Sequence, residues 1–396
     1  MRIAMFSWEA LHGWAVGGVA AHVTELAAAL QRRGHEVHVF TRPGYGTGGV
    51  AQINGVWYHW CPHNLNRSFV DEIQDMCRSF VWHFFQTEDS AGHFDVVHAH
   101  DWLASNAMVW IKKGRPDHRA VLTMHSTEYG RCGNNFWGGV SARIRDHERH
   151  GTYCADRVIA VSGALKSELM SMYNLPDWKG WVVYNGVPVH KFNKPIDPGA
   201  VKARYGIGPM DPTVLFIGRM AVQKGPDLLV EAIPGLLRHY PHAKFILAGE
   251  GHLRPEMEHR ARSLGVQHAI RWLGYMPNGQ AIDLFKACDV VCVPSRNEPF
   301  GIIVLEAWAA SKPVVASQNG GPGEFVWHNV NGLKVYPTVD SVGWGLGTVF
   351  TNFEWARWMG HNGRIAVETA FCWDSIADQV LDVYNNARNT AAGVAA

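Results

Sequence analysis

Short apolar runs and helical patterns alternate along the first half of the chain. Residues 2–7 form an apolar run that predicts a strand. The next apolar residues recur three or four positions apart, as on one face of a helix, at Val19, Val23, Leu26 and Leu30. Gly34 is typical of the end of such a helix. Further strands are predicted at 37–40, 53–60, 96–99, 120–124, 157–161 and 180–184, mostly with helical patterns between them.

The alternation stops near residue 188 and resumes after residue 212. Prolines crowd this stretch, which has little periodicity and is typical of a domain boundary: Pro188, Pro195, Pro198, Pro209 and Pro212. Beyond it, strands are predicted at 214–218, 244–248, 270–273, 289–293 and 313–317. Helices are predicted at 226–239, 254–264 and 279–287, after Glu298, and beyond residue 339.

Buried strands joined by helices predict an α/β protein of two doubly wound, Rossmann-like domains. The first domain is expected over residues 1–188, a linker over 189–211 and the second domain over 212–373. Residues 374–396 are predicted to form a C-terminal helix that returns to the first domain. Two such domains facing each other across a cleft are expected to bind a ligand at the carboxyl ends of their strands.

Composition narrows the class of protein. The 396 residues carry 36 Lys and Arg against 35 Asp and Glu, so a surface for nucleic acid is not expected. No apolar run reaches the length of a membrane span, and the first residues predict a strand rather than a signal peptide. The seven cysteines are scattered without a Cys-x-x-Cys pair, which favours free thiols and a cytoplasmic protein.

Histidine is abundant, but its spacing does not predict a metal site. His98 with His100, and His147 with His150, could be imagined as ligands, yet no cluster of Cys or acidic residues at ligand spacing accompanies them. For His98 and His100 a structural role is the preferred interpretation. We therefore expect no metal and no cofactor.

The chemistry concentrates in two segments of the second domain. Glu298-Pro-Phe-Gly-Ile-Ile-Val-Leu-Glu306 places one acid on a loop after a predicted strand and a second acid in a helix. Upstream, Arg219 and Lys224 follow another predicted strand and lie between two glycines. Two cations stabilise the charge that grows on a departing diphosphate, and carboxylates accept hydrogen bonds from sugar hydroxyls.

Each of these four residues also has a plain structural explanation. Arg219 or Lys224 alone is typical of a solvated turn, and Glu298 and Glu306 fit a helix surface or the N-terminus of a helix. The combination is harder to explain in that way. Two cations and two acids at the ends of strands favour a site for a nucleotide sugar.

Polar residues also follow the predicted strands of the first domain. Asp101 and His125 come directly after two of them, where such folds hold functional groups. Gly17 and Gly18 precede the first helix, whose N-terminus attracts anions. Asn185 lies before the domain boundary, although Asn-Gly there also fits an ordinary turn. The loop before this helix is not Gly-x-Gly-x-x-Gly and no acid follows it at the distance expected for a ribose, which disfavours a dehydrogenase, and no Walker A motif is present.

Together these motifs resemble the retaining glycosyltransferases of family 4, which have the two-domain GT-B architecture. The resemblance spans nearly the whole chain and rests on Gly17-Gly18, His125, Asn185-Gly186, Gly218-Arg219 with Lys224-Gly225, and Glu298 to Glu306. It implies metal-independent transfer from a nucleotide-diphosphate sugar, with retention at the anomeric carbon. It also implies that Arg219 and Lys224 bind the diphosphate, Glu306 the ribose, and Glu298 with His125 the sugar. Backbone amides complete the implied donor site at Gly17, Gly18, Phe300, Gly301, Ile302 and Ile303.

Within the family, residues 7–18 and 97–103 are similar to bacterial and archaeal glycogen synthases. Asp101 and Asn185 match positions that matter in those enzymes. Ala15 stands where typical glycogen synthases carry a lysine, and those enzymes generally lack the second acid, here Glu306. A glycogen-synthase-like member of family 4 is therefore predicted, with UDP-glucose, ADP-glucose and other hexose donors open.

The predicted reaction is transfer of glucose to an α-glucan or another sugar acceptor. One alternative is a family-4 enzyme that makes sucrose, trehalose, or a lipid- or thiol-linked glycoside. A UDP-sugar 2-epimerase shares the architecture, but the two acids eight residues apart argue against it; an inactive nucleotide-sugar-binding protein is a further alternative. Acceptor contacts are expected from the loop 127–140, where Tyr129 and Trp137 are candidates for stacking on sugar.

Overall fold

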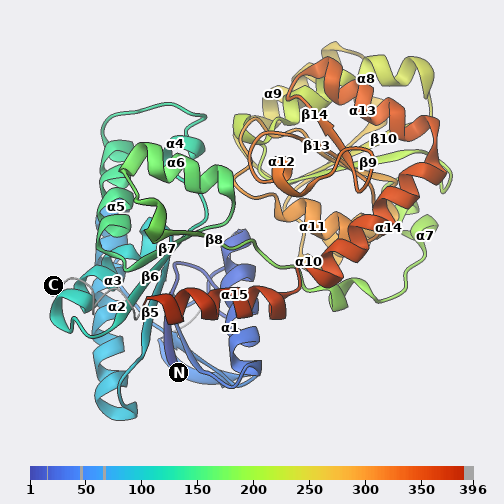
Figure 1. Ribbon diagram of the computed structural model, residues 1–396. Helices are drawn as coiled ribbons and strands as arrows, with labels where there is room; N and C mark the ends of the chain where they lie inside the picture. The colour runs from blue at the N-terminus through green and yellow to red at the C-terminus, as the bar shows by residue number, and fades with distance from the viewer. Residues whose placement is uncertain (16, 45–47, 66–67, 388–396) are drawn as a thin grey trace. The chain divides into compact units, whose positions relative to one another are not determined.

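The structure is a computed structural model that describes residues 1–15, 17–44, 48–65 and 68–387. The chain divides into two compact units, one of Met1–Asn185 with the segment from Trp373 onward, and one of Gly186–Cys372. Figure 1 shows both as a sheet with helices on its two faces. Each unit is described by itself below.

The first unit is built on eight strands in the order β3-β4-β2-β1-β5-β6-β7-β8. Their bounds are β1 Arg2–Phe6, β2 Glu36–Thr41, β3 Gly49–Ile53, β4 Val56–Trp60, β5 Val96–His100, β6 Arg119–Met124, β7 Arg157–Ala160 and β8 Gly180–Val182. All neighbours are parallel except β3 and β4. The predicted doubly wound sheet is therefore present.

The prediction of one strand over residues 53–60 was wrong. The structure has an antiparallel hairpin of β3 and β4 there, joined by Asn54 and Gly55. Both turn residues adopt positive φ, 50° and 80°, which is the backbone of the tight hairpin turns that favour Asn-Gly. The dipeptide was the available signal, and the apolar residues on either side of it obscured the turn.

Two layers of helices cover this sheet. Helices α1 (Gly18–Arg32) and α15 (Trp373–Asn386) lie side by side on one face (Figure 1), and share a buried core with Ile3 and Met5 of β1. On the other face, α2 (Phe69–Ala91), α3 (Asp101–Gly114) and α5 (Val140–Cys154) pack on one another. Phe6 of β1 points to this side and contacts rings of α2, because alternate residues of a strand face opposite ways. The short α4 (Glu128–Arg131) and α6 (Gly163–Tyr173) complete the unit.

The last helix is fixed to the first unit by packing and by charge. Val380, Val383 and Tyr384 are buried in the core that α1 also contributes to. At the surface, Arg32 and Arg33 at the end of α1 form ion pairs with Asp374 and Asp378 of α15.

The second unit has six parallel strands in the order β11-β10-β9-β12-β13-β14. They are β9 Thr213–Ile217, β10 Lys244–Ala248, β11 Ile270–Leu273, β12 Val290–Val293, β13 Val314–Ser317 and β14 Leu333–Val335. Its helices are α7 Pro198–Ala203, α8 Pro226–His239, α9 Arg254–Ser263, α10 Asn278–Ala287, α11 Ile302–Ala309, α12 Pro322–Phe325, α13 Val339–Thr351 and α14 Phe353–Thr369.

A single core joins α8, α9 and α13 to the sheet and includes Ala356 and Met359 of α14, which also packs on α11. Trp308 of α11 is fully buried, and a Cβ at Gly363 of α14 would lie 2.1 Å from its ring. Glycine at that position therefore sets how closely the two helices approach.

Residues 189–211, expected as a linker, lie within the second unit and are partly helical. They contain the 3₁₀ turn η2 (Val189–Phe192) and α7, which packs on α10. The Asp197 side chain accepts hydrogen bonds from the amides of Gly199 and Ala200 and so caps α7, with Pro198 at its first turn. Asp-Pro is a helix-start signal that a proline-rich composition can conceal.

Strand order defines one switch point in each sheet. In the first unit β1 lies between β2 and β5, and in the second β9 lies between β10 and β12. In each sheet, the connections that leave the two strands at this point turn to opposite sides. A crevice therefore opens at the carboxyl ends of these neighbouring strands. The loops after β1, β5, β9 and β12 are the ones this geometry offers to a ligand.

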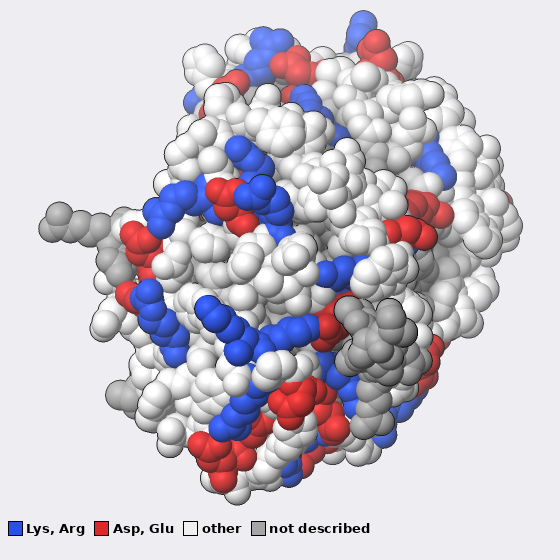
Figure 2. Space-filling model, turned by 60° about the vertical axis from the view of Figure 1, so that its left-hand side comes forward, with Lys and Arg blue, Asp and Glu red and all other residues white. Residues whose placement is uncertain are grey.

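Across the part of the chain that the structure describes, no helix combines the length and the apolarity that crossing a membrane requires. On the face shown in Figure 2, basic and acidic side chains are interspersed. Exposed ion pairs of the first unit include Arg143–Asp71 and Arg149–Asp146.

Candidate active site

Glycine brings together the two loops at the switch point of the second unit. Gly225, at the start of α8, has φ 68°, and a Cβ there would lie 2.4 Å from the carbonyl oxygen of Pro294. Only glycine fits both that backbone conformation and that contact. The loop after β9 consequently lies directly against the loop after β12.

Lys224 and Glu298 form an ion pair across this contact. The Lys224 Nζ lies 2.9 Å from Oε1 and 2.8 Å from Oε2 of Glu298, whose side chain is buried. Ser295 Oγ donates a third hydrogen bond to Oε2, at 2.9 Å. An ammonium has three N–H donors, so Lys224 keeps one for a ligand while the carboxylate holds it in place.

A second glycine contact fixes the Glu298 loop from the other side. The Gly321 amide donates to the Glu298 carbonyl at 2.9 Å. A Cβ at Gly320, where φ is 85°, would lie 2.0 Å from that same carbonyl oxygen. The loop after β13 thus holds the backbone of Glu298, while Lys224 and Ser295 hold its carboxylate, which makes a precise position for that group possible.

Arg219 is exposed at the same edge of the sheet. Its Nη2 donates to the Gln223 Oε1 at 2.9 Å, and Gln223 is buried. The Gln223 carbonyl in turn accepts from the amide of Arg296 in the loop after β12, at 2.8 Å. Gln223 was not predicted as a site residue, and it orients the guanidinium toward the solvent side of this edge.

Glu306 lies in the second turn of α11, partly buried among apolar residues. No hydrogen-bond or ion-pair partner for its carboxylate is found among the residues that the structure describes. Burial raises the pKa of Glu306 from 4.5 to about 7. Near neutral pH the group is therefore poised between its two protonation states, and a ligand with paired hydroxyls would supply the missing partners.

The raised pKa of Glu306 predicts how the stability of the folded protein depends on pH. Because folded Glu306 binds its proton more tightly than the unfolded chain, the free energy of unfolding falls as pH rises from 4.5 to about 7. Glu306→Gln removes that loss, so its Tm should exceed that of the wild type at pH 8 and approach it at pH 5. Glu256→Gln, at an exposed acid of α9, is the control. An equal Tm difference at both pH values would contradict the raised pKa.

The residues at the start of α11 follow directly on the Glu298 loop. Phe300 is buried and packs on Phe325, and Gly301 begins the helix with φ 97°. Within the described structure no side chain caps this helix. The amides of Ile302 and Ile303 thus lie at an uncapped helix N-terminus, which favours negative charge.

In the first unit, the Gly17 amide already has a partner. It donates to Oε2 of Glu9 at 2.7 Å, and Glu9 is buried. Gly18 then begins α1, for which no side-chain cap is found in the described structure. The expected approach of an anion to the Gly17 amide is therefore replaced in this structure by a carboxylate of the same chain, a contact that sequence analysis did not anticipate.

Asp101 and His125 meet where β5 and β6 end. The His125 amide donates to Asp101 Oδ1 at 2.7 Å, and Asp101 opens α3 with φ 57°. Burial raises the pKa of the Asp101 carboxyl, against the opposing effect of nearby Arg131. Asp101 thus holds the backbone that carries His125.

His22 connects His125 to Asn185. Its Nδ1 lies 2.8 Å from Asn185 Oδ1, and its ring stands edge-on to that of His125 with centroids 4.5 Å apart. His100 Nδ1 lies 3.3 Å from His125 Nε2. Burial lowers the pKa of His22, of His100 and, to about 3, of His125, so the three imidazoles are neutral at pH 7. Their ligand atoms are close enough to hold a metal, a convergence of separate elements that spacing did not reveal.

His98 has the structural role that was expected for it. Its Nδ1 contacts the Tyr384 hydroxyl and its Nε2 the Thr123 hydroxyl, both at 2.7 Å, inside the core. Of the two acceptor candidates, Tyr129 packs against Phe136 with ring centroids 4.7 Å apart, and Trp137 is largely exposed. Phe136 and Trp137 are exposed in the segment that leads into α5.

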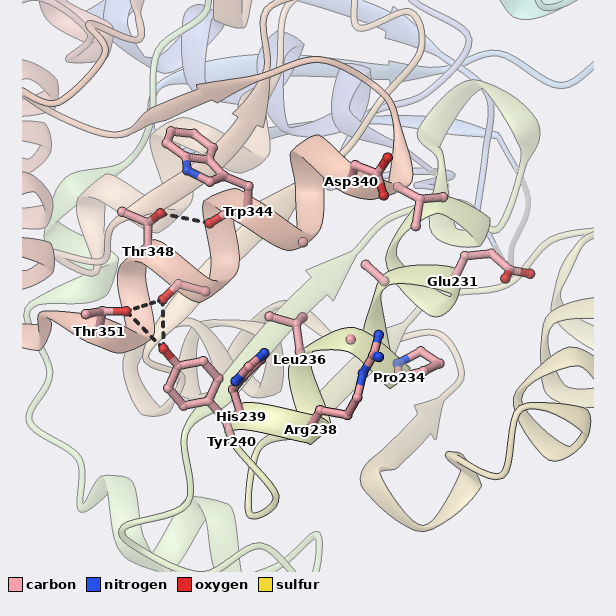
Figure 3. Close-up of a pocket in the computed structure, with 15 residues that line it drawn as sticks. Glu231, Pro234, Leu236, Arg238, His239, Tyr240, Asp340, Trp344, Thr348 and Thr351 are labelled. Carbon is pink, nitrogen blue, oxygen red and sulfur yellow. Dashed lines mark hydrogen bonds between the residues drawn. The ribbon is translucent and has the colours of Figure 1, made fainter.

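A surface hollow of about 620 Å³ lies elsewhere in the second unit (Figure 3). The C-terminal half of α8 and helix α13 line it, with Arg238, His239 and Trp344 among the lining residues. Helix α8 leaves the carboxyl edge of the sheet after β9 and ends before β10, so its C-terminal half lies toward the opposite edge. The hollow contains none of the predicted site residues.

Two family models match the chain, one in each half. The model described as Glycosyltransferase Family 4 matches residues 16–191, and the model described as Glycosyl transferases group 1 matches residues 200–365. Between them these ranges include every predicted site residue.

Relatives match over nearly the whole length. An uncharacterised glycosyltransferase of Methanocaldococcus jannaschii is 36% identical over 97% of this chain and 98% of its own. A D-inositol 3-phosphate glycosyltransferase of Xylanimonas cellulosilytica is 31% identical over 94% of this chain and 92% of its own. The glycogen synthase of Mycobacterium tuberculosis is 28% identical over 97% and 94%, respectively.

Solved structures show the fold. Sucrose-phosphate synthase from Thermosynechococcus elongatus superposes with a TM-score of 0.79 at 22% identity, over 97% of this chain and 98% of that one. The catalytic domain of starch synthase IV from Arabidopsis thaliana, bound to ADP and acarbose, gives 0.79 at 18% identity, over 98% and 99%. The predicted α/β fold of the GT-B type is confirmed by these matches.

Proposed function

The chain belongs to glycosyltransferase family 4. We propose that it transfers a hexose, with glucose as the first candidate, from a nucleotide-diphosphate sugar. The proposed acceptor is an α-glucan or another sugar. Transfer is proposed to retain the configuration at the anomeric carbon and to need no metal ion. The observation that carries the proposal is the Lys224–Glu298 pair beside Arg219 at the switch point of the second unit.

The charges at this site suit a departing diphosphate. Breaking the glycosidic bond to phosphate leaves negative charge on the bridging oxygen, and Arg219 and Lys224 supply the positive charge without a metal. Glu298 holds the Lys224 ammonium from behind with two hydrogen bonds. The uncapped amides at the start of α11 add donors for the same charge.

The nucleoside and sugar are assigned to the remaining groups. Glu306, which lacks a partner among the described residues, is proposed to accept hydrogen bonds from both ribose hydroxyls. Neutral His125, held by Asp101, is proposed to bind a hydroxyl of the transferred sugar. The starch synthase IV structure contains ADP and acarbose, and it supports a nucleoside diphosphate and an α-glucan as ligand classes.

A donor and acceptor screen tests this proposal. The purified protein is mixed with UDP-, ADP- and GDP-glucose, with and without glycogen or maltooligosaccharide, and released nucleoside diphosphate is measured. We expect release with one donor, greater in the presence of acceptor and unchanged by a chelator. NMR of the product should show an α-linkage. No release with any pair would contradict the proposal, and chelator-sensitive release would contradict its metal-free part.

A second acceptor class is favoured by one comparison. The D-inositol 3-phosphate glycosyltransferase is 31% identical to this chain, so it resembles the chain about as well as the glycogen synthase does at 28%. A polyol or polyol phosphate therefore belongs in the screen. Release that depends on inositol phosphate and not on glucan would replace the acceptor in the proposal and leave the donor chemistry unchanged.

A further inference from the structure

Histidine and carboxylate side chains also converge at the opposite edge of the first unit's sheet. Glu88 lies near the end of α2, His93 precedes β5, and His118 and Asp117 precede β6. Strands of a parallel sheet begin at the same edge, so these residues lie at the end away from Asp101 and His125. None of them takes part in the proposed transfer reaction.

His118 is oriented as metal-bound histidines are. Its Nδ1 lies 2.8 Å from the carbonyl oxygen of Phe94, which can only accept, so Nδ1 carries the proton. In a neutral ring the lone pair is then on Nε2, which faces Glu88 Oε1 at 3.2 Å inside the protein. That nitrogen makes no hydrogen bond to the described residues. The His118 Nε2 lone pair and the Glu88 carboxylate oxygen are both acceptors and repel each other. Either a cation between them or a second proton on the ring is therefore required.

A second histidine and a second acid reach the same carboxylate from the solvent side. His93 Nδ1 lies 3.5 Å from Glu88 Oε1 and 3.7 Å from Asp117 Oδ2. The ligand atoms of Glu88, His93 and His118 all lie within 4.8 Å of one another. In tetrahedral zinc sites, Zn–N and Zn–O bonds of about 2.0–2.2 Å place ligand atoms roughly 3.3–3.6 Å apart. The spacing here already approaches that value.

The surroundings orient the carboxylate and balance its charge. Arg115 pairs with Glu88 Oε2 and with Asp89, while the Phe94 amide donates to Glu88 Oε1 at 3.0 Å. Such outer contacts are typical of carboxylates and histidines that bind metals. Glu88, Asp89 and Asp117 offset the combined charge of Arg115 and a divalent ion. The His93 side chain is half exposed, which leaves an entry path and lets its ring turn toward the ion.

We propose that Glu88, His93 and His118, with Asp117 as the fourth ligand, bind a zinc ion at this edge. Two imidazoles and carboxylate oxygens suit Zn²⁺ better than Ca²⁺ or Mg²⁺, which prefer oxygen alone. Bound there, the ion ties the end of α2 to the segments before β5 and β6. Its role is structural, so it stabilises the folded first unit without taking part in transfer.

Cobalt spectroscopy on chelator-treated protein tests the site. One equivalent of Co²⁺ should give the visible absorption of a tetrahedral ion, and Zn²⁺ should displace it and raise the Tm. His93→Ala and His118→Gln should each weaken Zn²⁺ binding at least about tenfold, since one ligand of four is lost. His150→Ala, an exposed histidine beside Cys154 on α5, is the matched control and should bind as the wild type does.

Two outcomes would overturn the proposal. The first is no tight Zn²⁺ or Co²⁺ binding by the wild type, which would mean that a proton on His118 supplies the positive charge. The second is unchanged binding by both variants, which would place the ion elsewhere, for example at His22, His100 and His125. Because His93 is exposed, loss of its side chain should not unfold the protein, and circular dichroism of the variant checks this. Transfer activity should be the same with and without zinc.

Discussion

Replacing Arg219 by alanine is expected to lower kcat/KM for transfer about a hundred- to a thousandfold, the usual effect of removing one transition-state charge partner. Arg219 is exposed, and its guanidinium donates a hydrogen bond to Gln223. Loss of an exposed cation changes folding stability little. The Tm should therefore stay within about two degrees of the wild type. Steady-state kinetics with the preferred donor measure kcat/KM, and thermal unfolding measures the Tm.

The control for this variant is Arg262→Ala, which removes an exposed cation from α9 of the same unit. It should leave both kcat/KM and Tm unchanged. Arg219→Lys keeps a charge but loses the planar guanidinium and should recover only part of the rate. Normal turnover by Arg219→Ala would show that the residue belongs to a solvated turn and does not contact the diphosphate.

Much of the fold followed from apolar patterns, because buried parallel strands and amphipathic helices leave strong local signals. The predicted segments 226–239, 244–248 and 270–273 coincide with α8, β10 and β11. The three-residue β14 (Leu333–Val335) was not predicted. A segment that short has too few residues to show a period, and its place at the edge beside β13 is decided by tertiary packing.

The site residues were predictable one by one, but their contacts were not. Lys224 and Glu298 were given separate partners, whereas the structure pairs them because β9 and β12 are neighbours in the sheet. Strand order is a property of the whole fold and leaves no mark in either loop. His22 was missed for a similar reason: it lies on the buried face of α1 and becomes informative only beside His125 and Asn185.

The Lys224–Glu298 pair changes what a variant at Lys224 should do. A lysine in a solvated turn, the plain structural explanation of Lys224 from the sequence, could be replaced with little change in Tm. In the structure, loss of the Lys224 ammonium leaves the buried Glu298 carboxylate with the hydrogen bond from the Ser295 hydroxyl. Breaking a buried pair on one side costs on the order of 3 kcal/mol. Lys224→Met should therefore lose both folding stability and, by a thousandfold or so, transfer rate.

A double-mutant cycle with Glu298→Gln separates the pair from its parts. Glu298→Gln removes the carboxylate charge that holds Lys224, so turnover should again fall about a hundredfold or more. If the two side chains act as one unit, the double variant should be no slower than the slower single variant. The double variant should lose less free energy of unfolding than the two single variants lose together, by about 1–3 kcal/mol. Urea unfolding and steady-state kinetics on the four proteins give both couplings.

Lys202 and Asp289 provide the matched control pair. The Lys202 Nζ lies 2.8 Å from Asp289 Oδ2 in the same unit, and Lys202 is buried. Asp289 precedes β12, so this pair lies at the opposite edge of the sheet from Glu298, which follows β12. Lys202→Met should therefore destabilise the fold as Lys224→Met does but leave turnover by the remaining folded protein unchanged. Additive rate losses in the Lys224–Glu298 cycle, or an equal rate loss in Lys202→Met, would mean that the pair supports the loop and does not act on the departing diphosphate.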